Sequence, residues 1–267
     1  MNELKMDVEK STAPRVAIPV PNCVDRDYAE RALPQYEEAV RGAGGEPVRI
    51  EVDQTPAEVR KQIERCDAVL LPGSPADVDP KKYGAERHQK SAPADAKRDL
   101  LDGLLLEDAY HLHKPVLGIC YGLQSLNVHR SGSLVQHIES PVNHKAGRRI
   151  PKAHTVTIEG ESLLGKILKA FAGDGKPMVV NSSHHQSANA PGDGLRVVAR
   201  STDDGIVEAL EGTAPGHFVL AVQWHPERSV NDEPELAEPA HAIFLAFIAA
   251  ARARRAELAK MRESAGA

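Results

Sequence analysis

A cysteine set between two glycines is the residue of this chain best placed for chemistry. Residues 117–124 read Leu-Gly-Ile-Cys-Tyr-Gly-Leu-Gln, with a strand pattern before Cys120 and a helical pattern directly after it. This arrangement is typical of a nucleophile elbow, a turn so tight that a Cβ at Gly118 or Gly122 would collide with neighbouring chain. The helix dipole is expected to favour the thiolate of Cys120. The alternative, a buried structural cysteine, is disfavoured by the paired glycines.

A base for this thiol is available downstream. Residues 222–228 read Val-Gln-Trp-His-Pro-Glu-Arg and follow a predicted strand. His225 and Glu227 are two residues apart, so in a chain that Pro226 keeps extended their side chains leave on the same side. Glu227 can accept a hydrogen bond from one imidazole nitrogen while the other nitrogen faces Cys120. On its own, His-Pro-Glu would indicate a surface turn; together with the elbow it indicates a Cys–His–Glu triad.

Residues 70–80 form a third candidate segment, which follows a buried strand and contains Gly73 and several prolines. These residues force a turn at the carboxyl end of the sheet, where backbone N–H groups can point at a developing oxyanion. The N–H of Tyr121 is the natural second donor. Local composition alone would favour a plain surface turn.

The elements that must position these residues alternate between strand and helix in the first half of the chain. Strands are predicted at 15–20, 47–52, 68–71 and 115–119, and helices at 34–41, 55–65, 99–113 and 121–130. This alternation implies an α/β fold with a parallel, doubly wound sheet and helices on both faces. Ligands of such sheets bind beyond the carboxyl ends of the strands.

The second half of the chain changes character. Strands predicted at 155–158, 195–198, 206–210 and 218–223 form an added antiparallel segment, and a final helix is predicted at 239–259. Without a linker or a repeat, residues 15–260 are predicted to form one domain. Residues 1–14 are predicted to be a disordered lead-in, and residues 261–267 a tail of charged and small residues.

Composition excludes several classes of function. The chain has 267 residues, 41% of them hydrophobic, and a formal net charge of −5 without a basic stripe, so no nucleic-acid partner is expected. No stretch is expected to reach the roughly 18 apolar residues of a membrane-spanning helix. The N-terminus lacks the apolar core of a signal peptide. Three widely spaced cysteines give no disulfide framework. A cytoplasmic protein without membrane association is expected.

Five blocks of sequence resemble those of the class I glutamine amidotransferase-like hydrolases, and more narrowly the γ-glutamyl-γ-aminobutyrate hydrolase (peptidase C26) branch. The resemblance covers nearly the whole chain after Pro14. It implies a flavodoxin-like sheet, a triad that needs no cofactor, and a cysteinyl thioester intermediate. The blocks lie at 73–84, 118–124, 132–136, 180–186 and 223–227.

The resemblance also implies roles for single residues. It gives Cys120, His225 and Glu227 as the catalytic triad, and Cys120 as the nucleophile that attacks a γ-amide carbon. Oxyanion donors would come from the turn at Gly73 and Ser74 and from the N–H of Tyr121. The residues that would hold the glutamyl group are Gln124, Ser183, His184, His185 and Gln186.

The sequence departs from this branch at two places. Tyr121 stands where the branch usually has arginine, which affects substrate choice rather than catalysis because only the backbone N–H is required there. Ser131-Gly132 replaces a usual Gly-Gly at a turn.

The adjacent histidines at 184 and 185 raise the question of a metal. No carboxylate or third ligand lies at ligand spacing from them in the sequence, so no metal is expected and both are predicted to be walls of the glutamyl pocket. Cys23 and Cys66 lack flanking elbow glycines and are predicted to have no catalytic role.

Three functions remain open from the sequence. The first is a stand-alone hydrolase of γ-glutamyl amides such as γ-glutamyl-GABA, with a small-molecule substrate as its partner. The second is a glutaminase subunit that supplies ammonia to a synthase partner. The third, an inactive binding protein, is disfavoured by the intact Cys, His and Glu. Substrate selectivity is expected in the loops at 80–93 and 139–152, and a homodimer is conceivable.

Overall fold

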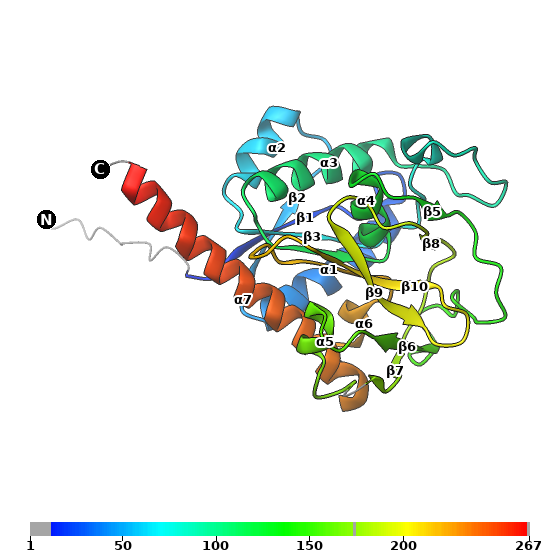
Figure 1. Ribbon diagram of the computed structural model, residues 1–267. Helices are drawn as coiled ribbons and strands as arrows, with labels where there is room; N and C mark the ends of the chain where they lie inside the picture. The colour runs from blue at the N-terminus through cyan, green and yellow to red at the C-terminus, as the bar shows by residue number, and fades with distance from the viewer. Residues whose placement is uncertain (1–11, 173–174, 266–267) are drawn as a thin grey trace, which may run out of the picture.

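A nine-stranded sheet forms the centre of the computed structural model, which describes residues 12–172 and 175–265 (Figure 1). Most of the predicted lead-in, residues 1–11, therefore lies outside the described residues. Five neighbouring strands run parallel: the four predicted in the first half of the chain, and also the strand predicted at 218–223, which was wrongly expected to be antiparallel. The predicted elbow follows one of these strands. In spatial order the five strands are β2 (Glu46–Ile50), β1 (Arg15–Pro19), β3 (Ala68–Leu71), β4 (Val116–Ile119) and β11 (Val219–Val222).

The remaining four strands of the sheet continue from β11 and are antiparallel, and three of them were predicted, at 155–158, 195–198 and 206–210. A separate two-stranded sheet pairs β5 (Leu134–Val135) with β8 (Ser187–Ala188). The antiparallel strands of the main sheet are, in spatial order, β10 (Val207–Gly212), β9 (Leu195–Ser201), β6 (His154–Ile158) and β7 (Met178–Val180).

Helices cover both faces of the sheet, as the doubly wound arrangement requires (Figure 1). Successive strand side chains point to opposite faces, so Val16 and Ile18 join one core cluster and Ala17 joins the other. The first cluster packs under α1 (Arg26–Gly42), α5 (Leu163–Ile167) and α7 (Pro234–Ala265), near the short α6 (Pro226–Ser229). The second packs under α2 (Pro56–Ile63), α3 (Ala96–His111) and α4 (Tyr121–His129).

Helix α1 begins eight residues before the predicted start. Pro34 was predicted to lie in the first turn, but Asp25 is the N-cap, and its side chain accepts a hydrogen bond from the Tyr28 N–H at 2.9 Å. Pro34 lies inside the helix instead. The short elements β7 and α5 were not predicted, because three and five residues show no clear periodicity.

Helix α7 is long and apolar enough over Pro234–Met261 to cross a membrane, judged by length and composition alone. The expectation that no stretch passes this test was therefore wrong. A core helix passes the same test, and here Ile243, Phe244 and Phe247 are buried in the cluster under β1. The helix also extends to Ala265, through most of the predicted tail.

The turn from β4 into α4 depends on two glycines. Cys120, at the centre of the turn, has φ 54° and ψ −105°, a conformation that L residues rarely adopt. A Cβ on Gly118 would lie 2.9 Å from the carbonyl group of Gly122, and a Cβ on Gly122 would lie 2.1 Å from the Leu71 carbonyl oxygen. Helix α4 thus lies against β3 and β4 at a distance that only glycine permits.

We therefore expect Gly122→Ala to destabilise the fold by about 3 kcal/mol or more, because backbone atoms of β3 must move to admit the methyl group. The free energy of unfolding from urea titration measures this change. Gly103→Ala is the matched control: Gly103 lies within α3 with no atom within 4 Å of an added Cβ, so this variant is expected to gain up to about 1 kcal/mol. A Gly122→Ala protein as stable as the parent would contradict the packing described here.

Candidate active site

Cys120 lies at the carboxyl end of β4 as the first residue before α4, where the elbow prediction placed it. Its N–H donates to the Val222 carbonyl of the neighbouring strand at 2.8 Å, and the N–H of Tyr121 hydrogen-bonds its sulfur. Only 6% of Cys120 is exposed. The sulfur thus lies in a buried position next to a backbone donor.

The thiol of Cys120 is uncharged in the free protein. Burial raises its pKa to about 12, and the nearby carboxylate of Glu227 adds to this, while the charge of Arg228 and the Tyr121 N–H act in the opposite direction. Burial thus opposes the thiolate that a position at the start of α4 was expected to favour. A thiol in this state could act as a nucleophile only with a base to remove its proton.

His225 is held in place by hydrogen bonds to its ring and to its backbone. Its Nδ1 lies 2.8 Å from Glu227 Oε1, and its Nε2 has no hydrogen-bond partner among the described residues. Asn181 accepts from the His225 N–H at 2.9 Å and donates to the His225 carbonyl at 2.8 Å. The chain is not extended here, as had been predicted. Pro226 begins the short helix α6, and the imidazole reaches Glu227 across its first turn.

The imidazole of His225 is neutral at physiological pH. Burial and the charge of Arg228 lower its pKa to about 4, against the opposing effect of Glu227. Burial acts to raise the pKa of the Glu227 carboxyl, but the contact with His225 outweighs it, so the pKa is lowered. A carboxylate only accepts hydrogen bonds, so Nδ1 carries the proton and Nε2 offers a lone pair.

Gly73 lies beside both the imidazole of His225 and the side chain of Cys120. A Cβ built on Gly73 would lie 3.0 Å from His225 Cε1 and 3.5 Å from the Cβ of Cys120. The absence of a side chain at Gly73 therefore leaves open the space that the base and the sulfur share. The structure thus brings together the three residues of the predicted triad.

The Gly73 N–H differs from its predicted role. It donates to the hydroxyl of Tyr36 at 3.0 Å, so it is not directed at a substrate oxyanion in this conformation. No local pattern indicates this contact, because Tyr36 lies in α1, far along the chain. Of the predicted donor segments, Ser74 and the N–H of Tyr121 lie at the cavity and at the sulfur respectively.

A cavity of about 330 Å³ opens in front of Cys120. All five predicted substrate-binding residues line it, together with Ser74. Asp77, Lys90 and Lys145 also line it and were not predicted individually, although both lysines belong to the loops expected to hold selectivity. The predicted residues in the lining are Gln124, Ser183, His184, His185 and Gln186.

Hydrogen bonds fix much of this wall. Gln124 Nε2 donates to the Gln186 carbonyl at 3.1 Å, and the Ser183 hydroxyl accepts from Arg228 at 2.8 Å. His185 Nε2 lies 3.0 Å from Asp77 Oδ1. The Gln186 Oε1 has no partner among the described residues and is a candidate acceptor for a substrate ammonium group.

His184 differs from its predicted role as a simple pocket wall. Its two ring nitrogens face the Gln186 carbonyl and Glu208, not the cavity. The expectation that no further ligand accompanies His184 was wrong, since the fold brings His144, His154 and Glu208 beside it. Ligands so far apart in the sequence leave no spacing signal that could have revealed them.

A second cavity, of about 340 Å³, contains Cys23 between α1 and β2. Burial and Asp95 raise the pKa of the Cys23 thiol to about 12, and no histidine lines this cavity. Cys66 is buried, and its thiol donates to the Gln62 carbonyl. Among the described residues, Cys23 has no histidine in its cavity, and the Cys66 thiol contacts a carbonyl oxygen rather than a base.

A family model connects this site to known proteins. The model named Peptidase C26 matches residues 20–227, which include all of the candidate site residues above. The γ-glutamyl-γ-aminobutyrate hydrolase of Escherichia coli (strain K12) is 34% identical over 214 residues, covering 76% of this chain and 81% of that protein. A glutamine amidotransferase-like protein of Rickettsia prowazekii is 29% identical over 252 residues, covering 77% of this chain and 87% of that protein.

Solved structures show the same fold. A protein described as part of a GMP synthase, from Thermoplasma acidophilum, matches with a TM-score of 0.62 and 17% sequence identity. The match covers 93% of this chain and 98% of that one. At this identity the likeness concerns the fold alone, and it agrees with the mostly parallel sheet expected from the sequence.

Proposed function

The chain belongs to the peptidase C26 family of glutamine amidotransferase-like proteins, and we propose that it hydrolyses γ-glutamyl amide bonds with Cys120 as the nucleophile. The observation that carries this proposal is that His225 Cε1 and Cys120 Cβ both lie within 3.5 Å of one point beside Gly73, and that Cys120 lines a polar cavity. Few other arrangements can activate a thiol that is uncharged at rest.

The first half of the reaction forms a thioester. His225 Nε2 takes the thiol proton as the sulfur attacks the γ-carbonyl carbon, and Glu227 stabilises the imidazolium that results. The imidazolium then gives its proton to the leaving nitrogen, and the C–N bond breaks. In the second half, His225 takes a proton from water as its oxygen attacks the thioester. Glutamate leaves and the thiol regains its proton.

The negative oxygen of each tetrahedral intermediate needs backbone donors. The N–H of Tyr121 already points at the sulfur, so it lies close to where the oxyanion develops. The Ser74 turn supplies the second donor in our proposal. The Gly73 N–H would contribute only if its bond to Tyr36 opened on substrate binding.

The cavity chemistry suits a γ-glutamyl group. Such a group carries an α-ammonium and an α-carboxylate, and the lining supplies oxygen acceptors and two lysines. A γ-glutamyl-GABA substrate adds a carboxylate on its leaving group. Lys90 and Lys145 are exposed residues of the lining and offer a place for this second carboxylate at the cavity mouth.

A glutaminase subunit is the second candidate. The γ-amide of glutamine would undergo the same steps, and the name of the Rickettsia relative refers to glutamine amidotransferases. Glutamine, however, has no carboxylate on its leaving group. The two lysines of the cavity therefore favour the larger γ-glutamyl amides.

Steady-state hydrolysis by the purified chain alone tests the proposed function. We expect kcat/KM for γ-glutamyl-GABA to exceed that for glutamine at least about tenfold, since a contact to a charged group contributes roughly 1.5 kcal/mol or more. Activity on glutamine that appears only when a synthase is added would contradict the hydrolase proposal and support the glutaminase subunit.

Two variants separate the candidate nucleophile from the other thiols. Cys120→Ala is expected to lower kcat by about a thousandfold or more, because the covalent route is lost. Cys66→Ser is the matched control and should retain nearly full activity, since a serine hydroxyl can keep the bond to the Gln62 carbonyl. Full turnover in Cys120→Ala would remove the basis of the mechanism.

The pH dependence of kcat/KM tests the state of the base. His225 accepts a proton only when neutral, and with a pKa of about 4 it stays neutral as the pH falls well below the usual imidazole value. We expect the acid limb near pH 4 to 5 and no rise through pH 8 to 9, because the Cys120 pKa is raised to about 12. Half-loss of kcat/KM near pH 6.5 would show an imidazole exposed to water.

A further inference from the structure

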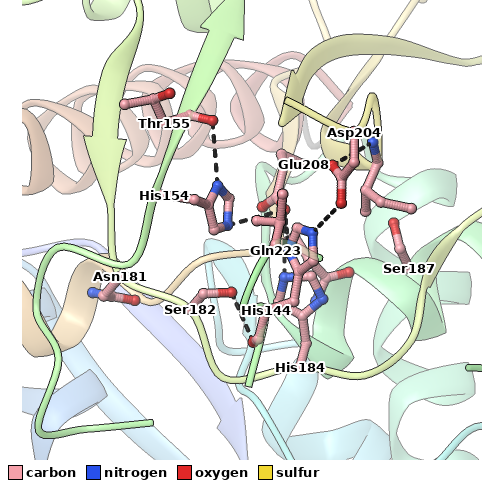
Figure 2. Close-up of polar contacts among 12 residues, drawn as sticks. His144, His154, Thr155, Asn181, Ser182, His184, Ser187, Asp204, Glu208 and Gln223 are labelled. Atoms are coloured by element: carbon pink, nitrogen blue, oxygen red, sulfur yellow. Dashed lines mark hydrogen bonds and ion pairs between the residues drawn. The ribbon is translucent and has the colours of Figure 1, made fainter. Parts of the chain in front are cut away.

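Three imidazoles surround one carboxylate beneath the wall of the active-site cavity (Figure 2). The four side chains are at most 3% exposed and come from separate parts of the chain. We refer to them as the histidine–glutamate cluster, which consists of His144 from the loop after β5, His154 of β6, His184 from the segment after β7, and Glu208 of β10.

One oxygen of Glu208 is the meeting point of the cluster. Its Oε1 lies 3.3 Å from His144 Nδ1, 3.4 Å from His154 Nε2 and 3.4 Å from His184 Nε2. All four of these ligand atoms lie within 4.8 Å of one another. The cluster therefore presents three nitrogens and one oxygen to a common centre.

The outer nitrogen of each ring lies next to an acceptor, and Figure 2 shows these contacts for His144 and His154. His144 Nε2 lies 2.8 Å from Asp204 Oδ2, His154 Nδ1 lies 3.3 Å from the Thr155 carbonyl, and His184 Nδ1 lies 3.0 Å from the Gln186 carbonyl. Carbonyl and carboxylate oxygens only accept hydrogen bonds, so each outer nitrogen must carry the proton.

The inner nitrogens of neutral rings are consequently lone pairs. They and both oxygens of Glu208 have no hydrogen-bond partner among the described residues. When all three rings are neutral, the four acceptor atoms of the cluster face one another in a buried space, which is unfavourable because a buried carboxylate then lies among lone pairs. A cation at the common centre removes this cost.

We propose that the histidine–glutamate cluster binds one divalent transition-metal ion, Zn²⁺ by the nature of its ligands. Imidazole and carboxylate ligands suit zinc, and a tetrahedral ion with bonds of about 2.0 to 2.1 Å holds its ligand atoms about 3.4 Å apart. The three distances to Glu208 Oε1 match that edge, and the separations among the four ligand atoms, which are all within 4.8 Å, would shorten where needed as the ion binds. Protonated outer nitrogens on carbonyl or carboxylate oxygens are the usual support of metal-binding histidines.

The ion would have a structural role beside the catalytic residues. Four protein ligands and full burial leave no open position for a substrate. His184 belongs to the segment that lines the cavity, and its N–H and the Ser182 hydroxyl both donate to the His144 carbonyl at 2.8 Å. The metal therefore joins β6 and β10 to the cavity wall, and this inference does not depend on which substrate is cleaved.

Metal analysis of the full chain, produced without a histidine tag or chelator, tests the proposal first. We expect about one zinc ion per chain, and one per chain again when a chelated sample is reloaded. Reloading with Co²⁺ should give the intense visible absorption of a tetrahedral cobalt site. Zn²⁺ should also raise the midpoint of thermal unfolding of the chelated protein.

Variants locate the ion within the chain. Glu208→Gln and His154→Ala are expected to lower the bound metal at least about tenfold and to abolish the cobalt spectrum. His185→Ala is the matched control, because His185 neighbours His184 in sequence but contacts Asp77 and His137 instead of the cluster. It should keep the full metal content.

Two results would overturn the proposal. One is a folded parent protein that holds less than about a tenth of an ion per chain and shows neither a cobalt spectrum nor a zinc-induced thermal shift. The cluster would then be neutralised by protons alone. The other is loss of metal in His185→Ala but not in His154→Ala, which would place the ion on the surface histidines. Both readouts on the parent protein remain valid even where a cluster variant does not fold.

Discussion

The close contact of helix α4 with strands β3 and β4 is the constraint on which the site depends. It holds Cys120 at φ 54°, and it exists because Gly118 and Gly122 have no Cβ to collide with the neighbouring backbone. The strain at Cys120 is outweighed by the packing of the parallel sheet and its helices on both sides. The same contact sets the thiol at the carboxyl end of β4, next to the end of β11 that leads to His225.

Burial determines the chemistry of this site. It keeps the Cys120 thiol protonated and the His225 imidazole neutral, so the resting pair has no charge to stabilise. In the proposed mechanism, charge develops only when the proton moves from Cys120 to His225, and Glu227 and the Tyr121 N–H already lie where they would stabilise it. A preorganised site of this kind does not need a low thiol pKa in the free protein. The cavity lining, by contrast, is polar and reaches solvent through its lysines.

Short-range sequence patterns predicted much of the fold and much of the candidate site. The glycines around Cys120 and the alternation of strands and helices are short-range signals, and four of the five parallel strands follow from them. The fifth, β11, lies in the second half of the chain and was predicted to be antiparallel. Long-range contacts left no such signal. The Gly73 N–H donates to the hydroxyl of Tyr36 in α1, which is far away in the sequence. Glu208 lies beside three histidines that come from three separate segments of the chain. Helix α1 begins earlier than the position of Pro34 predicted, because Asp25, farther upstream, is its N-cap.

The most direct measurement is mass analysis of the chain quenched in acid during turnover of γ-glutamyl-GABA, followed by digestion. The thioester mechanism predicts one glutamyl group on the peptide that contains Cys120, lost on treatment with hydroxylamine and absent from Cys120→Ala. Turnover without any acyl group on this peptide, or with the group on another residue, would contradict the central claim that Cys120 is the nucleophile.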